Sequence, residues 1–96
     1  MINLAWIEKG ANEKFAVGLE YVAPDLEAGE TITDVSVSVI PTGLTVGTPV
    51  VDGAKVKVSI EGGTLAQTYR VQFRVTTSAG YVYEHPERDA ILVRIV

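Results

Sequence analysis

The 96-residue sequence contains no cysteine and only one histidine, His85. Without cysteine the chain cannot form a disulfide framework, a thiolate metal site or a Cys-His nucleophile. A Ser-His-Asp triad would need His85, which precedes a proline in a charged segment, and no serine stands in a G-x-S-x-G turn. A zinc site would have to be completed by carboxylates alone. We therefore expect no enzymatic activity, no cofactor and no metal.

The sequence also lacks an excess of positive charge and any long apolar run. Eight Lys and Arg residues against twelve Asp and Glu residues give a net charge of −4, whereas nucleic-acid binding needs a concentrated basic face. No run reaches the roughly 18 apolar residues of a membrane span. The first residues, MINLAWIEKG, lack the cationic leader and apolar core of a signal peptide. We expect no nucleic-acid partner and no membrane association. The absence of cysteine also fits folding in a reducing cytoplasm.

Alternation of apolar and polar residues with a period of two runs through most of the chain and predicts β-strands. Gly, Pro and Asp residues separate the alternating segments and indicate turns. The segments are 4–7, 15–22, 31–40, 44–46, 49–51, 54–60, 69–76, 81–83 and 90–96. They predict about seven short strands in one all-β domain, a single antiparallel β-sandwich that occupies residues 1–96.

Local patterns add three expectations about these strands. In segment 31–40, Ile32 has the opposite parity to the later valines, which indicates a bulge near Thr33 and Asp34. Asp52-Gly53 is typical of a hairpin turn that needs positive φ. In segment 54–60, Val56, Val58 and Ile60 are expected to face the core, with Lys55, Lys57 and Ser59 facing water.

A few residues are candidates for an interaction surface. Trp6 is the only tryptophan, and in an apolar first strand it is expected to pack in the core or in an interface. Tyr81 and Tyr83 could form a binding stripe, although packing against the long strand is favoured. Arg70 and Arg74 form a small basic stripe that favours solubility, but arginine is also enriched where proteins dock.

Two acidic segments contain oxygen ligands of the kind that calcium binds at one end of a sandwich. These residues are Asp25, Glu27 and Glu30 in one segment, and Glu84, Glu87 and Asp89 in the other. Neither segment has the alternating D-x-D-x-[DN]-G spacing. A solvated acidic face is therefore the favoured interpretation.

The segment Thr68-Tyr69-Arg70-Val71-Gln72-Phe73 resembles the start of the penultimate strand in immunoglobulin-like and fibronectin type III domains. In those domains a tyrosine at this place hydrogen-bonds back to the preceding corner, and the resemblance implies that structural role for Tyr69. The chain reversal at Gly62-Gly63 leaves backbone groups that a buried phenol hydroxyl can pair with. The resemblance implies an immunoglobulin-like sandwich.

A second resemblance rests on an ordered set of short motifs and covers residues 6–80. The main ones are Leu26…Gly29-Glu30-Thr31-Ile32-Thr33, Gly43-Leu44-Thr45-Val46, Gly62-Gly63-Thr64, Tyr69 and Thr76-Thr77-Ser78-Ala79-Gly80. The set is similar to a group of small tailed-bacteriophage virion proteins of the fiber–tail adaptor type. This chain departs from the group at Ala66-Gln67, where the group often has a glycine, and in the additional HPERD segment, residues 85–89.

The resemblance implies a non-enzymatic structural component of a tailed-phage virion, made in the host cytoplasm. It would act as a head, neck or tail adaptor or as a decoration module, docking on other virion proteins and forming homo-oligomers in the particle. A bacterial immunoglobulin-like or carbohydrate-binding module from a larger surface protein or glycosidase is the alternative. In that case exposed aromatic residues such as Trp6 or Tyr81 would bind sugar.

Overall fold

The chain folds into β-strands throughout the part that the structure describes. A computed structural model describes residues 5–21, 29–86 and 89–96, which form nine strands and no helix. The strands are β1 (Ala5–Lys9), β2 (Lys14–Glu20), β3 (Ile32–Ile40), β4 (Leu44–Val46), β5 (Val50–Asp52), β6 (Lys55–Gly62), β7 (Thr68–Thr77), β8 (Val82–Tyr83) and β9 (Ala90–Ile95). The all-β prediction is confirmed. The count exceeds seven because short segments, β4, β5 and β8, each pair with a longer strand.

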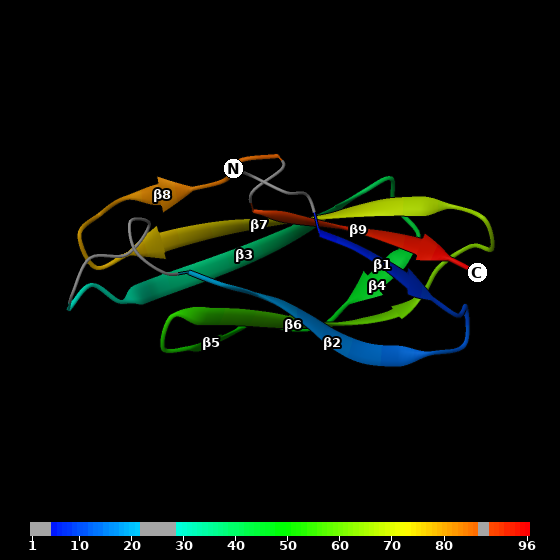
Figure 1. Cartoon of the computed structure of the whole chain (residues 1–96), viewed down its shortest axis with the longest axis horizontal. Coiled ribbons are helices and arrows are strands. Elements are labelled where there is room, and N and C mark those ends of the chain that lie inside the picture. Colours follow the sequence, from blue (N-terminus) through cyan, green and yellow to red (C-terminus); the bar gives the residue numbers. More distant parts are fainter. Residues whose placement is uncertain (1–4, 22–28, 87–88) are drawn as a thin grey trace.

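These strands form two sheets that face each other (Figure 1). Sheet A has the order β1-β9-β7-β3, with β8 also paired to β7, and sheet B has the order β2-β6-β4, with β5 also paired to β6. One pair departs from the expected antiparallel arrangement, because β1 runs parallel to β9. Parallel neighbours need a long connection. Since β1 and β9 lie near opposite ends of the chain, the rest of the domain provides it.

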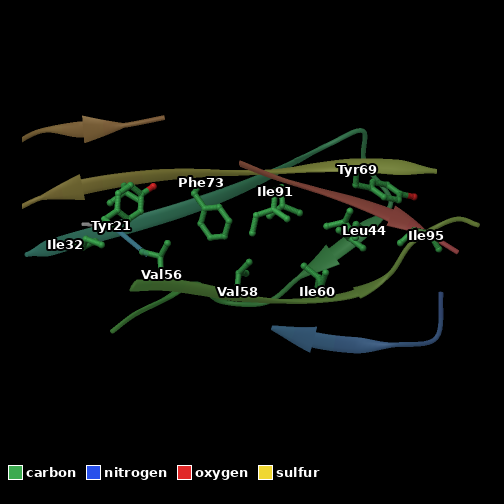
Figure 2. Close-up of a cluster of buried hydrophobic side chains, with 13 residues drawn as sticks. Tyr21, Ile32, Leu44, Val56, Val58, Ile60, Tyr69, Phe73, Ile91 and Ile95 are labelled. Atoms are coloured by element: carbon green, nitrogen blue, oxygen red, sulfur yellow. The ribbon is translucent and has the colours of Figure 1, made fainter. Parts of the chain in front are cut away.

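The core lies between the sheets and comes from the inward-facing positions of the alternating strands (Figure 2). The largest contributions are Tyr69, Val71, Phe73 and Val75 from β7, Ile91, Val93 and Ile95 from β9, and Val56, Val58 and Ile60 from β6. The predicted inward set of β6 is therefore confirmed. Fully burying a side chain of this size stabilises a fold by about 1.5–3 kcal/mol before the entropy of ordering is subtracted.

Two further local predictions are confirmed. The register between β3 and β7 shifts between Ile32 and Asp34, which is the bulge that the parity of Ile32 indicated. Asp52 pairs with Lys55 across a tight turn in which Gly53 has a φ of +62°. This φ is easily reached by glycine and is unfavourable for residues with a Cβ.

The segment between β6 and β7 carries the chain from sheet B to sheet A. Tyr69 is buried, and its hydroxyl accepts a hydrogen bond from the Thr64 N–H at 3.0 Å. Gly63 has a φ of +103°, and a Cβ there would lie 2.6 Å from Cδ1 of Ile95. Ala66 has a φ of +68°, in the left-handed region. This backbone conformation is reached more easily by glycine than by a residue with a Cβ.

Lys9, at the end of β1, is fully buried in the same part of the molecule. Its ammonium group donates to the carbonyl oxygens of Gly10 and Gly62, both at 2.8 Å. The Lys9 carbonyl accepts a hydrogen bond from the Val96 N–H at 2.8 Å. These bonds join β1, the end of β6 and the residue after β9, so a charged side chain satisfies backbone acceptors at one end of the sandwich.

Candidate docking face

Strand register brings four exposed or half-buried side chains into one line on the outer face of sheet A. Trp6 of β1 lies opposite Leu92 of β9, Leu92 lies opposite Arg70 of β7, and Arg70 lies opposite Ile40 of β3. Trp6 is 52% exposed and Ile40 is 64% exposed. We call Trp6, Leu92, Arg70 and Ile40 the cross-strand row.

The outward direction of the row follows from the alternation of each strand. The neighbouring positions Ile7 and Val93 pack in the core, so Trp6 and Leu92 face the opposite side of the sheet. On β7, Tyr69 and Val71 are buried on either side of Arg70. Of the two places expected for Trp6, the core is wrong, because β1 turns Ile7 inward instead, and packing in an interface stays a prediction.

Two more arginines lie on the outer face of sheet A. Arg74 is four residues beyond Arg70 on β7 and opposite Ser36, and Arg94 lies opposite Glu8 and Thr68. The strands of this face also carry two acidic residues, Glu8 and Asp34. The Asp34 carboxylate accepts a hydrogen bond from the Val35 N–H at 2.9 Å. The strand positions of this face thus present three arginines and two acids.

The segment between β8 and β9 borders the row. Arg70 donates through its guanidinium to the Pro86 carbonyl. Gln72, the next outward position of β7, is only 9% exposed, and its amide donates to the carbonyls of His85 at 3.0 Å and Asp89 at 3.2 Å. His85 and Asp89 therefore cover the sheet next to the row, and Pro86 contacts Arg70 directly.

Asp89 holds this segment in place. It is fully buried, and its carboxylate accepts from the Tyr21 hydroxyl at 2.7 Å and from the His85 N–H at 2.6 Å. Asp89 thus connects sheet B with the residues that precede β9 in sheet A, since Tyr21 directly follows β2. Hydrogen bonding compensates for the burial of a carboxylate.

The acidic residues considered as calcium ligands are only partly described. Asp25, Glu27 and Glu87 lie outside the described residues. Within the described ranges, no group of three or more His, Cys, Asp or Glu side chains is arranged to hold a metal ion. Of the described acids in the two segments, Asp89 uses both carboxylate oxygens to anchor the chain.

The two candidate tyrosines lie apart from the row. The ring of Tyr83 stacks on that of Tyr21, with centroids 6.2 Å apart and planes at 24°, and it packs against the core. Tyr81 is 58% exposed, and its N–H donates to the Thr77 hydroxyl at 3.3 Å. Of the sequence candidates, the structure brings together only Trp6 and Arg70, with Arg74 on the same face.

Leu92 and Ile40 complete the row but were not expected from the sequence. The outward direction of Ile40 could have been predicted from alternation, because Val35, Val37 and Val39 face inward and Ile40 directly follows Val39. Segment 90–96 is almost continuously apolar, so alternation alone cannot show which way Leu92 points. Only the pairing of four distant strands shows that these residues are neighbours.

The outer face of sheet B has a different character. Lys14 lies opposite Glu61, and Glu20 lies opposite Lys55, with which it forms a salt bridge of 3.9 Å. A groove of about 350 Å³ along β2 and β6 is lined by residues 16–20 and 55–57, which include core-facing Val17, Leu19 and Val56 as well as outward-facing residues. The charged residues of the groove are exposed. Its residues resemble a solvated surface more than a reactive site.

Among the described residues there is no helix long and apolar enough to cross a membrane.

Comparisons with known proteins identify the family of the chain. A search of curated proteins gave no match. A family model described as podophage GP4 fiber-tail adaptor protein gp77 matches residues 9–86, a range that includes every strand from β2 to β8. The match confirms the expected relation to phage tail adaptors, and the chain therefore belongs to the podophage GP4 fiber-tail adaptor protein gp77 family.

Proposed function

We propose that the protein is a non-enzymatic adaptor of a tailed-phage virion that docks on other virion proteins. The family match over residues 9–86 is the observation that carries this proposal. The exposed row supports it, because tryptophan and arginine are enriched in protein interfaces. The protein is made in the host cytoplasm and is then incorporated into the particle.

We also propose that the single domain is immunoglobulin-like. Immunoglobulin sandwiches place strands B, E and D in one sheet and strands C, F and G in the other. The order β2-β6-β4 in sheet B and β3-β7-β9 in sheet A corresponds to that arrangement. Tyr69, near the start of β7 and bonded back to the Thr64 N–H, supports a tyrosine corner at the same place.

Deletion and complementation of the gene in its phage tests the adaptor function. We expect mass spectrometry to find the protein in purified virions, and we expect virions from the deletion to lack fibers and to adsorb poorly to the host. Supplying the wild-type chain in the host should restore both. Absence of the protein from purified wild-type virions would show that the proposal is wrong.

The exposure of Trp6 also favours a second function, binding of carbohydrate, since aromatic rings in water provide stacking platforms for sugars. A glycan array with the wild-type chain and Trp6→Ala tests this alternative. It predicts a signal for the wild type that the substitution removes. Silence of the wild-type chain would contradict it.

A further inference from the structure

We propose that the cross-strand row of sheet A is the docking surface, and that its partner is a protein surface that is acidic around an apolar centre. This inference rests on the proposed adaptor function and specifies the face and the chemistry of the partner. The described residues of sheet B form a second large outer face, so the composition and the charge of the two faces are compared.

The composition of the row distinguishes it from the other face. Interfaces are enriched in aromatic residues and Arg, and they are depleted in Lys and Glu. The row consists of Trp6, Leu92, Arg70 and Ile40. On sheet B the corresponding outward positions of β2 are Lys14, Ala16, Gly18 and Glu20. Among the described residues, tryptophan and arginine face outward from the strands of sheet A, whereas the exposed large apolar residues in the strands of sheet B are Val50 and Val51 of β5.

Arg70 is well placed to recognise a carboxylate. It lies between the two aliphatic side chains of the row, and the Pro86 carbonyl accepts a hydrogen bond from one of its terminal nitrogens. A guanidinium has five N–H donors in a planar fork that matches a carboxylate. The remaining donors can bind a partner, and a side chain already held in place loses less entropy on binding.

The charge of this face differs from that of the whole chain. The chain has a net charge of −4, whereas the strand positions of this face present three arginines, Arg70, Arg74 and Arg94, against Glu8 and Asp34. Charge complementarity therefore favours an acidic partner. A second copy docked face to face would place two faces with the same excess of positive charge against each other, which is less favourable than an acidic partner.

Photo-cross-linking in assembled virions tests the location of the interface. Virions of the deletion phage are grown with the chain carrying Trp6→benzoylphenylalanine in the row, or Lys57→benzoylphenylalanine on sheet B as the control. We expect the probe at position 6 to cross-link to a second virion protein, at a segment containing Asp or Glu, and we expect no such product from position 57. Cross-links from position 57 alone, to a second copy alone, to glycan or nucleic acid, or to a segment without acidic residues would overturn the inference.

Incorporation of charge variants provides a second measurement. Arg70→Glu should reduce the number of copies per virion at least about 10-fold, as expected for a residue central to an interface. Arg70→Lys should cause a smaller loss, because it keeps the charge but not the fork. Trp6→Ala should also reduce incorporation, and the control Lys57→Glu should not. Circular dichroism of each purified variant confirms that it is folded.

The outcomes separate this inference from the proposed function. If the wild-type chain is found in virions while Arg70→Glu and Trp6→Ala are incorporated at the wild-type level, the adaptor function stands and the docking face is wrong. If the wild-type chain is absent from virions, both are wrong. Loss of incorporation for the two row variants, with Lys57→Glu unaffected, supports both.

Discussion

The outer faces of the two sheets differ although both sheets present alternating strands to the same core. On sheet B, lysines and glutamates lie opposite each other, as in Lys14 with Glu61 and Lys55 with Glu20. On sheet A, arginines lie next to exposed apolar side chains, as in Arg70 between Leu92 and Ile40. Exposed Lys-Glu pairs contribute little energy and keep a surface soluble. Exposed tryptophan and isoleucine are unfavourable in water, and a partner that covers them would account for their presence.

The faces also differ in how they are supported. On the outer face of sheet A, the carbonyls of His85 and Asp89 bind Gln72 and that of Pro86 binds Arg70. On the described part of sheet B, the groove along β2 and β6 is open and is lined by the strands themselves. The difference suggests tests in which one face is disturbed and the other is used as the reference.

The largest effect is expected from removal of the anchor, Asp89→Ala. The substitution leaves the Tyr21 hydroxyl and the His85 N–H without this acceptor, and we expect a loss of about 3 kcal/mol in the free energy of unfolding. Urea denaturation measures it. The control Glu61→Ala changes an exposed carboxylate in a strand of sheet B and should stay within about 0.5 kcal/mol. Equal losses in the two variants would contradict the anchoring role of Asp89.

A smaller effect is expected at the corner that connects the sheets. Tyr69→Phe removes the acceptor of the Thr64 N–H and should lower the free energy of unfolding by about 1 kcal/mol. Because the corner belongs to both sheets, hydrogen exchange should become faster in β6 and β7 alike. Tyr81→Phe, at an exposed ring, is the matched control and should change stability by less than about 0.5 kcal/mol. Faster exchange in one sheet alone would show that the corner does not couple them.

A substitution in the same connection between β6 and β7 is expected to stabilise the fold. Ala66 has a φ of +68°, so Ala66→Gly should relieve strain and, after the greater entropy of the unfolded glycine chain is subtracted, should stabilise the fold by about 0.5 kcal/mol. Ala79→Gly, in an exposed turn with an ordinary φ, should instead destabilise by a similar amount. Thermal unfolding of the two variants checks the opposite signs. A lower melting temperature for Ala66→Gly would contradict the prediction.

The smallest effect is expected on the outer face of sheet B. A double-mutant cycle of Glu20→Ala and Lys55→Ala should give a coupling energy of about 0.5 kcal/mol or less, because both side chains are more than half exposed. Neither substitution should change the number of copies per virion. A coupling energy well above 1 kcal/mol, or a loss of incorporation, would show that sheet B is more than a solvated face.

Much of the local structure could be predicted from particular residues. The parity of Ile32 indicated the bulge, Asp52-Gly53 indicated the hairpin, and the alternation of β6 indicated its buried side. Each of these depends on residues that are close in the sequence. The exposure of Trp6 and the burial of Lys9 could not be predicted, because the partners of Lys9 include Gly62, 53 residues away, and because β1 pairs with the last strand.

The sequence by itself determined the strands, the turns and the family, because these depend on a period of two, on glycine and proline at chain reversals, and on short motifs. The tertiary structure decided which residues share a face. Trp6, Ile40, Arg70 and Leu92 come from four separate strands, and only the register of three strand pairs places them in one row. Register sets the face and the neighbours of every side chain at once, and a shift of one residue would move the row into the core.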